Sequence, residues 1–147
     1  MNTERSRVRE IMETEVAVLS PDERLDLAED VMRLGQIRHL PVVEDGRLVG
    51  VVSSRDLLAS SLSRVLDFDP KRRRTFLRSI EVKEVMASEP ISVAPEATLR
   101  EAGEKMLHHR IGCVPVVKPD GTLIGLVTET DLLRALVLGG DDAHADE

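Results

Sequence analysis

The sequence has 147 residues, a formal net charge of −7, a single cysteine, and neither Trp nor Tyr. A chain of this length can bury one substantial core, but one cysteine rules out an intrachain disulfide, and no apolar run reaches the roughly 20 residues of a membrane-spanning helix. The charged start, Met1–Glu10, lacks the apolar stretch of a signal peptide. Without aromatic platforms for stacked bases, we expect a cytoplasmic protein that binds neither nucleic acid nor membrane.

The same unit is written twice in this chain. Val8–Val43 returns as Val82–Val117, and Asp45–Gly50 returns as Asp120–Gly125 after one inserted residue near Pro119. A single copy of a repeat often cannot bury its apolar face alone, so we expect the two copies to pack face to face. The predicted boundaries are 7–63 for the first repeat, 64–80 for a partly helical linker, 81–138 for the second repeat and 139–147 for an acidic disordered tail.

Each copy opens with a short helix and a strand. Val8, Ile11 and Met12 have helical spacing, and short apolar runs at Ala17–Leu19 and Ile91–Val93 predict strands. Ser20–Glu23 then predicts a helix start, with Ser20 as N-cap, Pro21 in the first turn and Glu23 closing a capping box. The second copy keeps the proline in Ala94-Pro95-Glu96 but lacks that capping hydroxyl.

The remaining elements are an amphipathic helix, a hairpin and a final helix. Leu25, Ala28 and Met32 share one helix face. Asp45-Gly46 and Asp120-Gly121 each separate two apolar runs, which is typical of a β-hairpin. Final helices are expected from about Ser54 and Glu129. The predicted fold class is α+β, with each repeat ordered helix-β-α-β-β-α and its helices on one side of a short mixed sheet.

The linker contains a basic run followed by an apolar stripe. Asp69-Pro70 predicts a helix start, Lys71–Arg74 supplies four consecutive cations, and Phe76, Leu77 and Ile80 lie on one helix face. One interpretation is a connecting helix that covers an edge of the module and leaves its basic run in water. The alternative is a dimer or effector contact in which the basic run meets acidic groups or a ligand phosphate.

These features together resemble a tandem CBS-domain protein, in which a pair of units named after cystathionine β-synthase forms a Bateman module. The resemblance rests on the Pro-Val-Val and Asp-Gly-x-Leu-hydrophobic-Gly motifs, followed by Ser/Thr-x-x-Asp-Leu-Leu, in the same order in both copies. It implies two repeats packed about a pseudo-twofold axis with facing sheets. It also implies a homodimer, and clefts between the repeats that bind adenosine-containing ligands such as AMP, ADP or ATP.

Ser53-x-x-Asp56 and Thr128-x-x-Asp131 are the motifs with the clearest chemistry. Each stands where a strand ends and a helix begins, and a helix N-terminus offers free N–H groups and partial positive charge to a phosphate. The hydroxyl can donate to a phosphate oxygen, and the aspartate can accept from ribose hydroxyls. The resemblance implies these same roles at the matching positions.

The resemblance also implies where adenine would lie, which is between the first strand and the segment before Pro-Val-Val. The candidates in the first repeat are Ala17, Val18, Arg38, His39 and Leu40. Those in the second repeat are Ile91, Ser92, Gly112, Cys113 and Val114.

The two copies differ in positive charge near these motifs. The first has Arg38 and Arg55 where the second has Gly112 and Thr130. A phosphate drawn out of water needs cationic partners, so we expect inequivalent sites, one of them preferred by a phosphorylated ligand. Solvated surface charge is the alternative interpretation of both arginines.

Simpler interpretations remain for several residues. Ser/Thr-x-x-Asp is also a plain helix-capping pattern. His108 and His109 point about 100° apart on a helix and have no accompanying cluster, so we expect no metal site. Cys113 is more typical of a small core residue than of a reactive thiol. No catalytic triad, P-loop or dinucleotide fingerprint is present, so we predict no catalytic residues and no required cofactor.

The sequence therefore predicts a regulatory module that binds an adenine nucleotide and signals to a separate, unknown effector protein. Ligand would change the relative angle of the repeats and shift the population of a partner surface. The alternative is a ligand-free dimerisation or scaffolding module, in which Ser53, Asp56, Thr128 and Asp131 only cap helices.

Overall fold

The computed structural model describes residues 2–62 and 69–145, which form two compact units. The first unit is Ala17–Pro90, and the second combines Met1–Val16 with Ile91–Glu147. The units therefore cut across the sequence repeats. Each takes the leading segment of the opposite copy. The predicted boundaries 7–63 and 81–138 describe the repeats of the sequence and are not the boundaries of these structural units.

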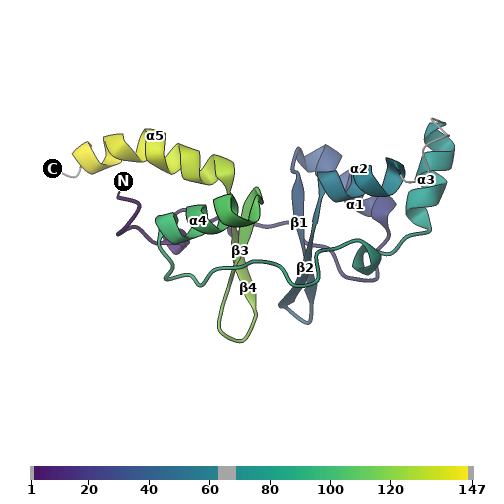
Figure 1. Ribbon diagram of the computed structural model, residues 1–147, viewed down its shortest axis with the longest axis horizontal. Helices are drawn as coiled ribbons and strands as arrows, with labels where there is room; N and C mark the ends of the chain where they lie inside the picture. Colours follow the sequence, from purple (N-terminus) through teal and green to yellow (C-terminus); the bar gives the residue numbers. More distant parts are fainter. Residues whose placement is uncertain (1, 63–68, 146–147) are drawn as a thin grey trace. The chain divides into compact units, whose positions relative to one another are not determined.

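A hairpin with two helices on one face forms the first unit (Figure 1). Strands β1 (His39–Glu44) and β2 (Arg47–Ser53) pair antiparallel around Asp45 and Gly46. Both turn residues have positive φ, 53° and 80°, as a type I′ turn requires. Helices α1 (Leu25–Gly35) and α2 (Ser54–Leu62) pack against this hairpin. The hairpin, the final helix and the predicted α+β class are confirmed.

The second unit repeats this plan. Strands β3 (Cys113–Val117) and β4 (Leu123–Thr128) form its antiparallel hairpin. Helices α4 (Leu99–His109) and α5 (Glu129–Ala145) pack on one face of it (Figure 1). The apolar helix faces predicted from sequence are buried in both units, and the residues concerned are Leu25, Ala28, Met32, Leu99, Ala102 and Met106.

The leading segments complete the opposite units through matching backbone bonds. Each contains the predicted short helix as one turn of 3-10 helix, η1 (Val8–Glu10) or η2 (Val82–Glu84). The Val8 N–H donates to Ala97 O at 2.8 Å, and the Val82 N–H donates to Glu23 O at 2.7 Å. Both valines are fully buried, each in the core of its unit. The exchange therefore supplies core side chains as well as hydrogen bonds.

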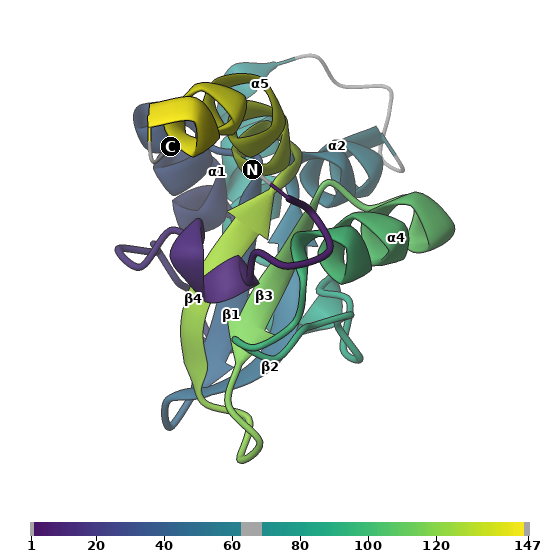
Figure 2. The same cartoon turned by 90° about the vertical axis from the view of Figure 1, so that its left-hand side faces the viewer.

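Each leading segment also adds a short bridge to a hairpin. Glu13 and Leu126 exchange two backbone hydrogen bonds of 2.9 and 3.0 Å, so that the N-terminal segment runs beside β4 (Figure 2). Ala87 and Val51 exchange two bonds of 2.9 and 3.2 Å in the first unit. Glu13 and Ala87 thus occupy equivalent places in the two units.

The predicted start of α1 is wrong. Ser20–Glu23 forms a turn, and α1 begins at Leu25 with Arg24 as N-cap. The backbone of this stretch pairs instead with the segment beginning the second repeat, because Glu23 O accepts from Val82 and the Leu25 N–H donates to Ile80 O at 3.0 Å. In the second unit Thr98 caps α4, accepting from the Glu101 N–H at 3.1 Å. This Thr-x-x-Glu signal in the sequence is one that we missed.

Two further expectations need correction. The strands expected at Ala17–Leu19 and Ile91–Val93 shrink to single parallel bridges at Leu19 and Val93, since Pro21 and Pro95 follow within two residues and proline cannot donate to a ladder. The tail expected to be disordered from residue 139 is helical as far as Ala145, because each added residue extends an already nucleated helix by one hydrogen bond.

The linker helix α3 (Pro70–Arg78) docks on α1. Asp69 caps it as predicted, accepting from the Lys71 N–H at 3.0 Å, and Leu77 is fully buried in the first core. The expectation that the whole basic run stays in water is wrong, because Arg73 pairs with Glu29 and Arg74 donates to Asp30 at 2.7 Å. The Arg74 hydrogen bond holds the pKa of the Asp30 carboxyl below its usual value. The basic run therefore meets acidic groups of the same chain.

We predict that Gly50→Ala destabilises the protein by about 1–3 kcal/mol, because its new methyl would overlap Met86 and lie 3.0 Å from Ala87 O. The matched control is Gly103→Ala inside α4, where the nearest atom, on Leu132, is 3.7 Å away. This control should gain about 0.5–1 kcal/mol from helix propensity. Urea unfolding monitored by circular dichroism measures both changes, and equal stability of the two variants would contradict the close docking of Ala87 on β2.

Candidate functional site

The first Ser/Thr-x-x-Asp motif forms a closed capping box at the start of α2. The Ser53 N–H donates to Asp56 Oδ2 at 2.8 Å, and the Asp56 N–H donates to Ser53 Oγ at 3.1 Å. The two side chains therefore satisfy two backbone donors of this helix start reciprocally. This is the helix-capping role that the simpler interpretation predicts.

Thr128 and Asp131 repeat the arrangement at the start of α5. The Thr128 N–H donates to Asp131 Oδ2 at 2.8 Å, and the Asp131 N–H donates to Thr128 Oγ1 at 3.2 Å. Asp131 is the more deeply placed aspartate, only 5% exposed. In both boxes the hydroxyl oxygen accepts a bond and keeps its own proton, which can still be donated to an anion. Capping and ligand binding are therefore chemically compatible.

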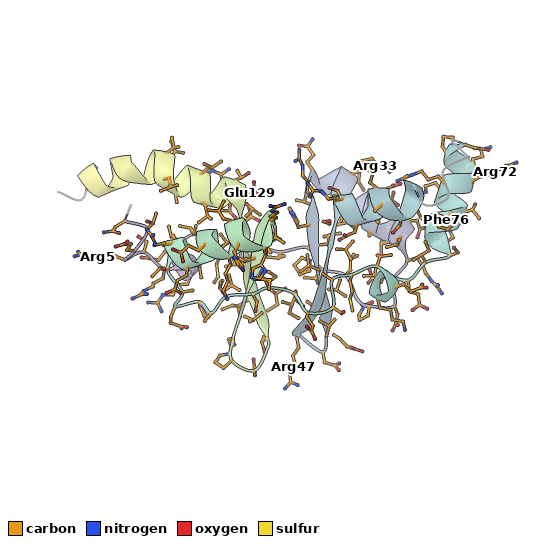
Figure 3. The ribbon with its side chains drawn as sticks, viewed as in Figure 1. Arg5, Arg33, Arg47, Arg72, Phe76 and Glu129 are labelled. Atoms are coloured by element: carbon orange, nitrogen blue, oxygen red, sulfur yellow. The ribbon has the colours of Figure 1, made fainter. Side chains whose placement is uncertain are left out.

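Backbone bonds bring the predicted neighbours of each motif together. The Ser54 N–H donates to Arg38 O at 2.8 Å, and the Glu129 N–H donates to Gly112 O at 3.0 Å. Figure 3 shows Glu129 at this point, where α5 begins. The residue before each hairpin is thereby attached to the helix that follows the hairpin.

The short segments expected to line adenine lie along the same hairpins. The Leu19 N–H donates to Pro41 O at 3.0 Å, and the Val93 N–H donates to Pro115 O at 3.0 Å. Ala17 and Val18, just before the first bridge, are exposed. Each unit therefore places its first segment, the start of its hairpin and its capping box in one continuous hydrogen-bonded arrangement.

Some of the predicted site residues belong to the cores instead of the surface. Leu40 and Val114 are fully buried, and Cys113 is 4% exposed. The side chains of these three residues are therefore part of the cores. His39 begins β1 opposite Ser53, and the half-buried Ile91 and Ser92 precede the Val93 bridge. Lys105 of α4 donates to Ser92 O at 2.8 Å, a cation that the sequence analysis missed.

Arg38 and Arg55 meet at a cavity of about 590 Å³ in the first unit. The cavity lies over α1 and the first turn of α2 and is not lined by Ser53 or Asp56. Two more arginines that we did not single out as site residues contribute to it. Its lining consists of Glu29, Met32, Arg33, Ile37, Arg38, Ser54, Arg55, Leu57, Leu58 and Arg73. A positive surface therefore adjoins the first capping box.

Glu13 is the functional candidate that the sequence analysis missed entirely. Partial burial, followed by the negative charge of Asp131, raises the pKa of the Glu13 carboxyl above its usual value. Arg134 opposes this effect with Nη1 3.8 Å from Asp131 Oδ1. No local sequence signal relates Glu13 to Asp131, because their contact follows from the exchange of leading segments.

Within residues 2–62 and 69–145, the structure contains no group of three or more His, Cys, Asp and Glu side chains able to hold a metal ion. The rings of His108 and His109 lie edge to face, with centroids 4.8 Å apart. Over the same described stretch, no helix combines the length and the apolar character needed to cross a membrane.

Cys113 should be nearly inert in the folded protein. Burial, aided by the negative charge of Glu129, raises the pKa of its thiol to about 12, and only the thiolate is nucleophilic. We predict that a thiol reagent at pH 8 labels the native protein at least about a hundredfold more slowly than the unfolded chain. Thr75→Cys in a Cys113→Ala background supplies an exposed reference thiol on α3. Equal labelling rates at the two positions would contradict the buried assignment.

Comparison with known proteins identifies relatives along nearly the whole chain. A CBS domain-containing protein of Dictyostelium discoideum is 32% identical over 131 residues, covering 88% of this chain and 90% of that protein. The crystal structure of a putative acetoin utilization protein, AcuB, from Vibrio cholerae superposes with a TM-score of 0.77 at 31% identity, covering 96% of both chains. The crystal structure of CBSX2 in complex with AMP has a TM-score of 0.76 at 28% identity, covering 90% of this chain and 97% of that one.

The family model of the CBS domain matches this sequence twice, at residues 8–63 and 82–138. The two matches coincide with the two copies of the repeated unit. The chain therefore belongs to the CBS-domain family and carries two tandem CBS domains.

Proposed function

We propose that this protein is a regulatory module that binds adenosine-containing nucleotides at the starts of α2 and α5. The observation that supports this most strongly is the pair of capping boxes. Each presents a hydroxyl proton and a carboxylate at a helix N-terminus, where partial positive charge favours a phosphate. A carboxylate can accept hydrogen bonds from the ribose hydroxyls. Each box can therefore bind both the phosphate and the ribose of a nucleotide.

The first unit is the better candidate for a phosphorylated ligand. Arg38 and Arg55 adjoin its box at the cavity described above, and guanidinium groups pair with phosphate in a bidentate, charge-assisted manner. The AMP complex of the similar protein CBSX2 supports an adenosine-type ligand. We propose that the nucleotide is AMP, ADP or ATP.

The signalling step follows from population-shift thermodynamics. A ligand that binds one conformation more tightly than another raises the population of that conformation in proportion to the difference in affinity. We propose that this shift alters a surface read by a separate effector protein in the cytoplasm. No chemical turnover of the ligand is part of the mechanism, and nucleotide recovered after incubation should be unchanged.

A ligand-free scaffold is the second candidate function. The closed capping boxes favour it, because all four motif residues take part in hydrogen bonds that cap helices. Exposed leucines on the helices also favour an assembly role. Leu34 and Leu107 are 80% and 83% exposed at the ends of α1 and α4.

A thermal-shift panel of adenosine, AMP, ADP and ATP tests ligand binding. A nucleotide at 100 times its dissociation constant should add about 2.7 kcal/mol to the free energy of unfolding. Asp56→Ala and Asp131→Ala should each reduce the gain from those ligands of the panel that bind at the substituted box. Asp69→Ala is the matched control, because it removes a helix-cap aspartate from α3, outside both boxes.

The panel separates the two candidate functions. If no nucleotide raises the melting temperature of the wild type, the scaffold function stands. If nucleotides stabilise the wild type and both box variants equally, the protein binds them at another site.

We also propose that the protein is a homodimer that buries these exposed leucines against a second copy. Sedimentation equilibrium should give about twice the 16.3 kDa chain mass, and Leu34→Glu with Leu107→Glu should return the mass to that of one chain, since a charge at each position opposes burial. Arg47→Glu, in the exposed β1–β2 turn, is the control that should leave the dimer intact. A single-chain mass for the wild type would refute the dimer.

A further inference from the structure

The two capping boxes face different residues of the docked leading segments. Glu13 exchanges two backbone bonds with Leu126, two residues before Thr128, and burial together with the negative charge of Asp131 raises the pKa of its carboxyl. Ala87 makes the equivalent exchange with Val51, two residues before Ser53. The second box therefore has an added carboxyl group where the first has only a methyl group.

Two cations stand near the second box, and one of them is already engaged. Arg134 lies 3.8 Å from Asp131, and Lys105 is engaged with Ser92 O. Glu129, exposed at the first position of α5, adds a further carboxylate to this end of the helix. Gly112 and Thr130 stand at the positions where the first unit has Arg38 and Arg55. The second box therefore has more carboxyl groups, and fewer cations at the matching positions, than the first.

We propose that Glu13 is a specificity-determining residue of the second box. Because of Glu13, the second box selects neutral or cationic adenosine derivatives that carry no phosphate. Phosphorylated ligands bind at the first box. This inference rests on the proposed nucleotide-binding function and assigns a ligand class to each site. An ionised Glu13 repels a phosphate that approaches the start of α5, whereas it is compatible with an uncharged ribose and attracts a cationic substituent.

The charge of Glu13 can be removed with little change of shape. In an Asp56→Ala background, which disables the first box, Glu13→Gln should strengthen AMP binding to the second box by on the order of tenfold or more. Adenosine, which carries no phosphate, should bind within about threefold of its original affinity. Isothermal titration calorimetry with both ligands at pH 7.5 measures the ratio, and circular dichroism checks that each variant is folded.

The reciprocal substitution is the matched control. Ala87→Glu in an Asp131→Ala background places the same carboxyl group at the first box. It should weaken AMP binding by a similar factor and again leave adenosine nearly unchanged. If Ala87→Glu does not fold, the Glu13→Gln measurement alone still decides the proposal.

The outcomes distinguish this inference from the function on which it rests. If the wild type binds neither adenosine nor AMP, the proposed function fails. If the wild type binds them but Glu13→Gln leaves the AMP-to-adenosine affinity ratio unchanged, or changes both affinities equally, Glu13 has no electrostatic role in selectivity and this inference alone is overturned.

Discussion

The docking of each leading segment onto the opposite unit is the interaction on which the rest of the structure depends. It inserts Val8 and Val82, both fully buried, into the two cores, and it fixes Glu13 and Ala87 on β4 and β2 by paired backbone bonds. The glycine at position 125 permits this approach in the second unit, because a methyl group there would lie 2.5 Å from Met12 Sδ. Helix start, hairpin and leading segment are therefore constrained together.

The same docking makes two nearly identical motifs chemically different. The two capping boxes contain the same hydrogen bonds. The bond from the aspartate N–H to the hydroxyl oxygen is 3.1 Å long in the first box and 3.2 Å in the second. Their surroundings differ because Glu13 approaches Asp131, whereas Ala87 lies at the equivalent place in the first unit. The chain contains two copies of one helix start, and the exchanged segments give each copy a different neighbour, Glu13 or Ala87, which is the basis of the ligand selectivity proposed above.

Local signals in the sequence predict most of the elements but not their partners. The Asp45-Gly46 turn, the buried face of α1 and the Asp69-Pro70 start of α3 are each encoded within a few residues, and all three were predicted correctly. The start of α1 was misplaced because Glu23 O bonds to Val82, far along the chain. The pairing of the basic run with α1 and the contact of Glu13 with Asp131 escaped prediction for the same reason. All three features depend on contacts between residues far apart in the chain, and a single sequence does not show which distant residues meet.

The unfolding of two fragments tests the exchange of segments most directly. Residues 17–90 form the first unit with its docked leading segment, whereas residues 7–63 form the first sequence repeat without it. Urea unfolding followed by circular dichroism should show a cooperative transition for the fragment 17–90 and none for the fragment 7–63. A cooperative fold in 7–63, together with an unfolded 17–90, would contradict the account.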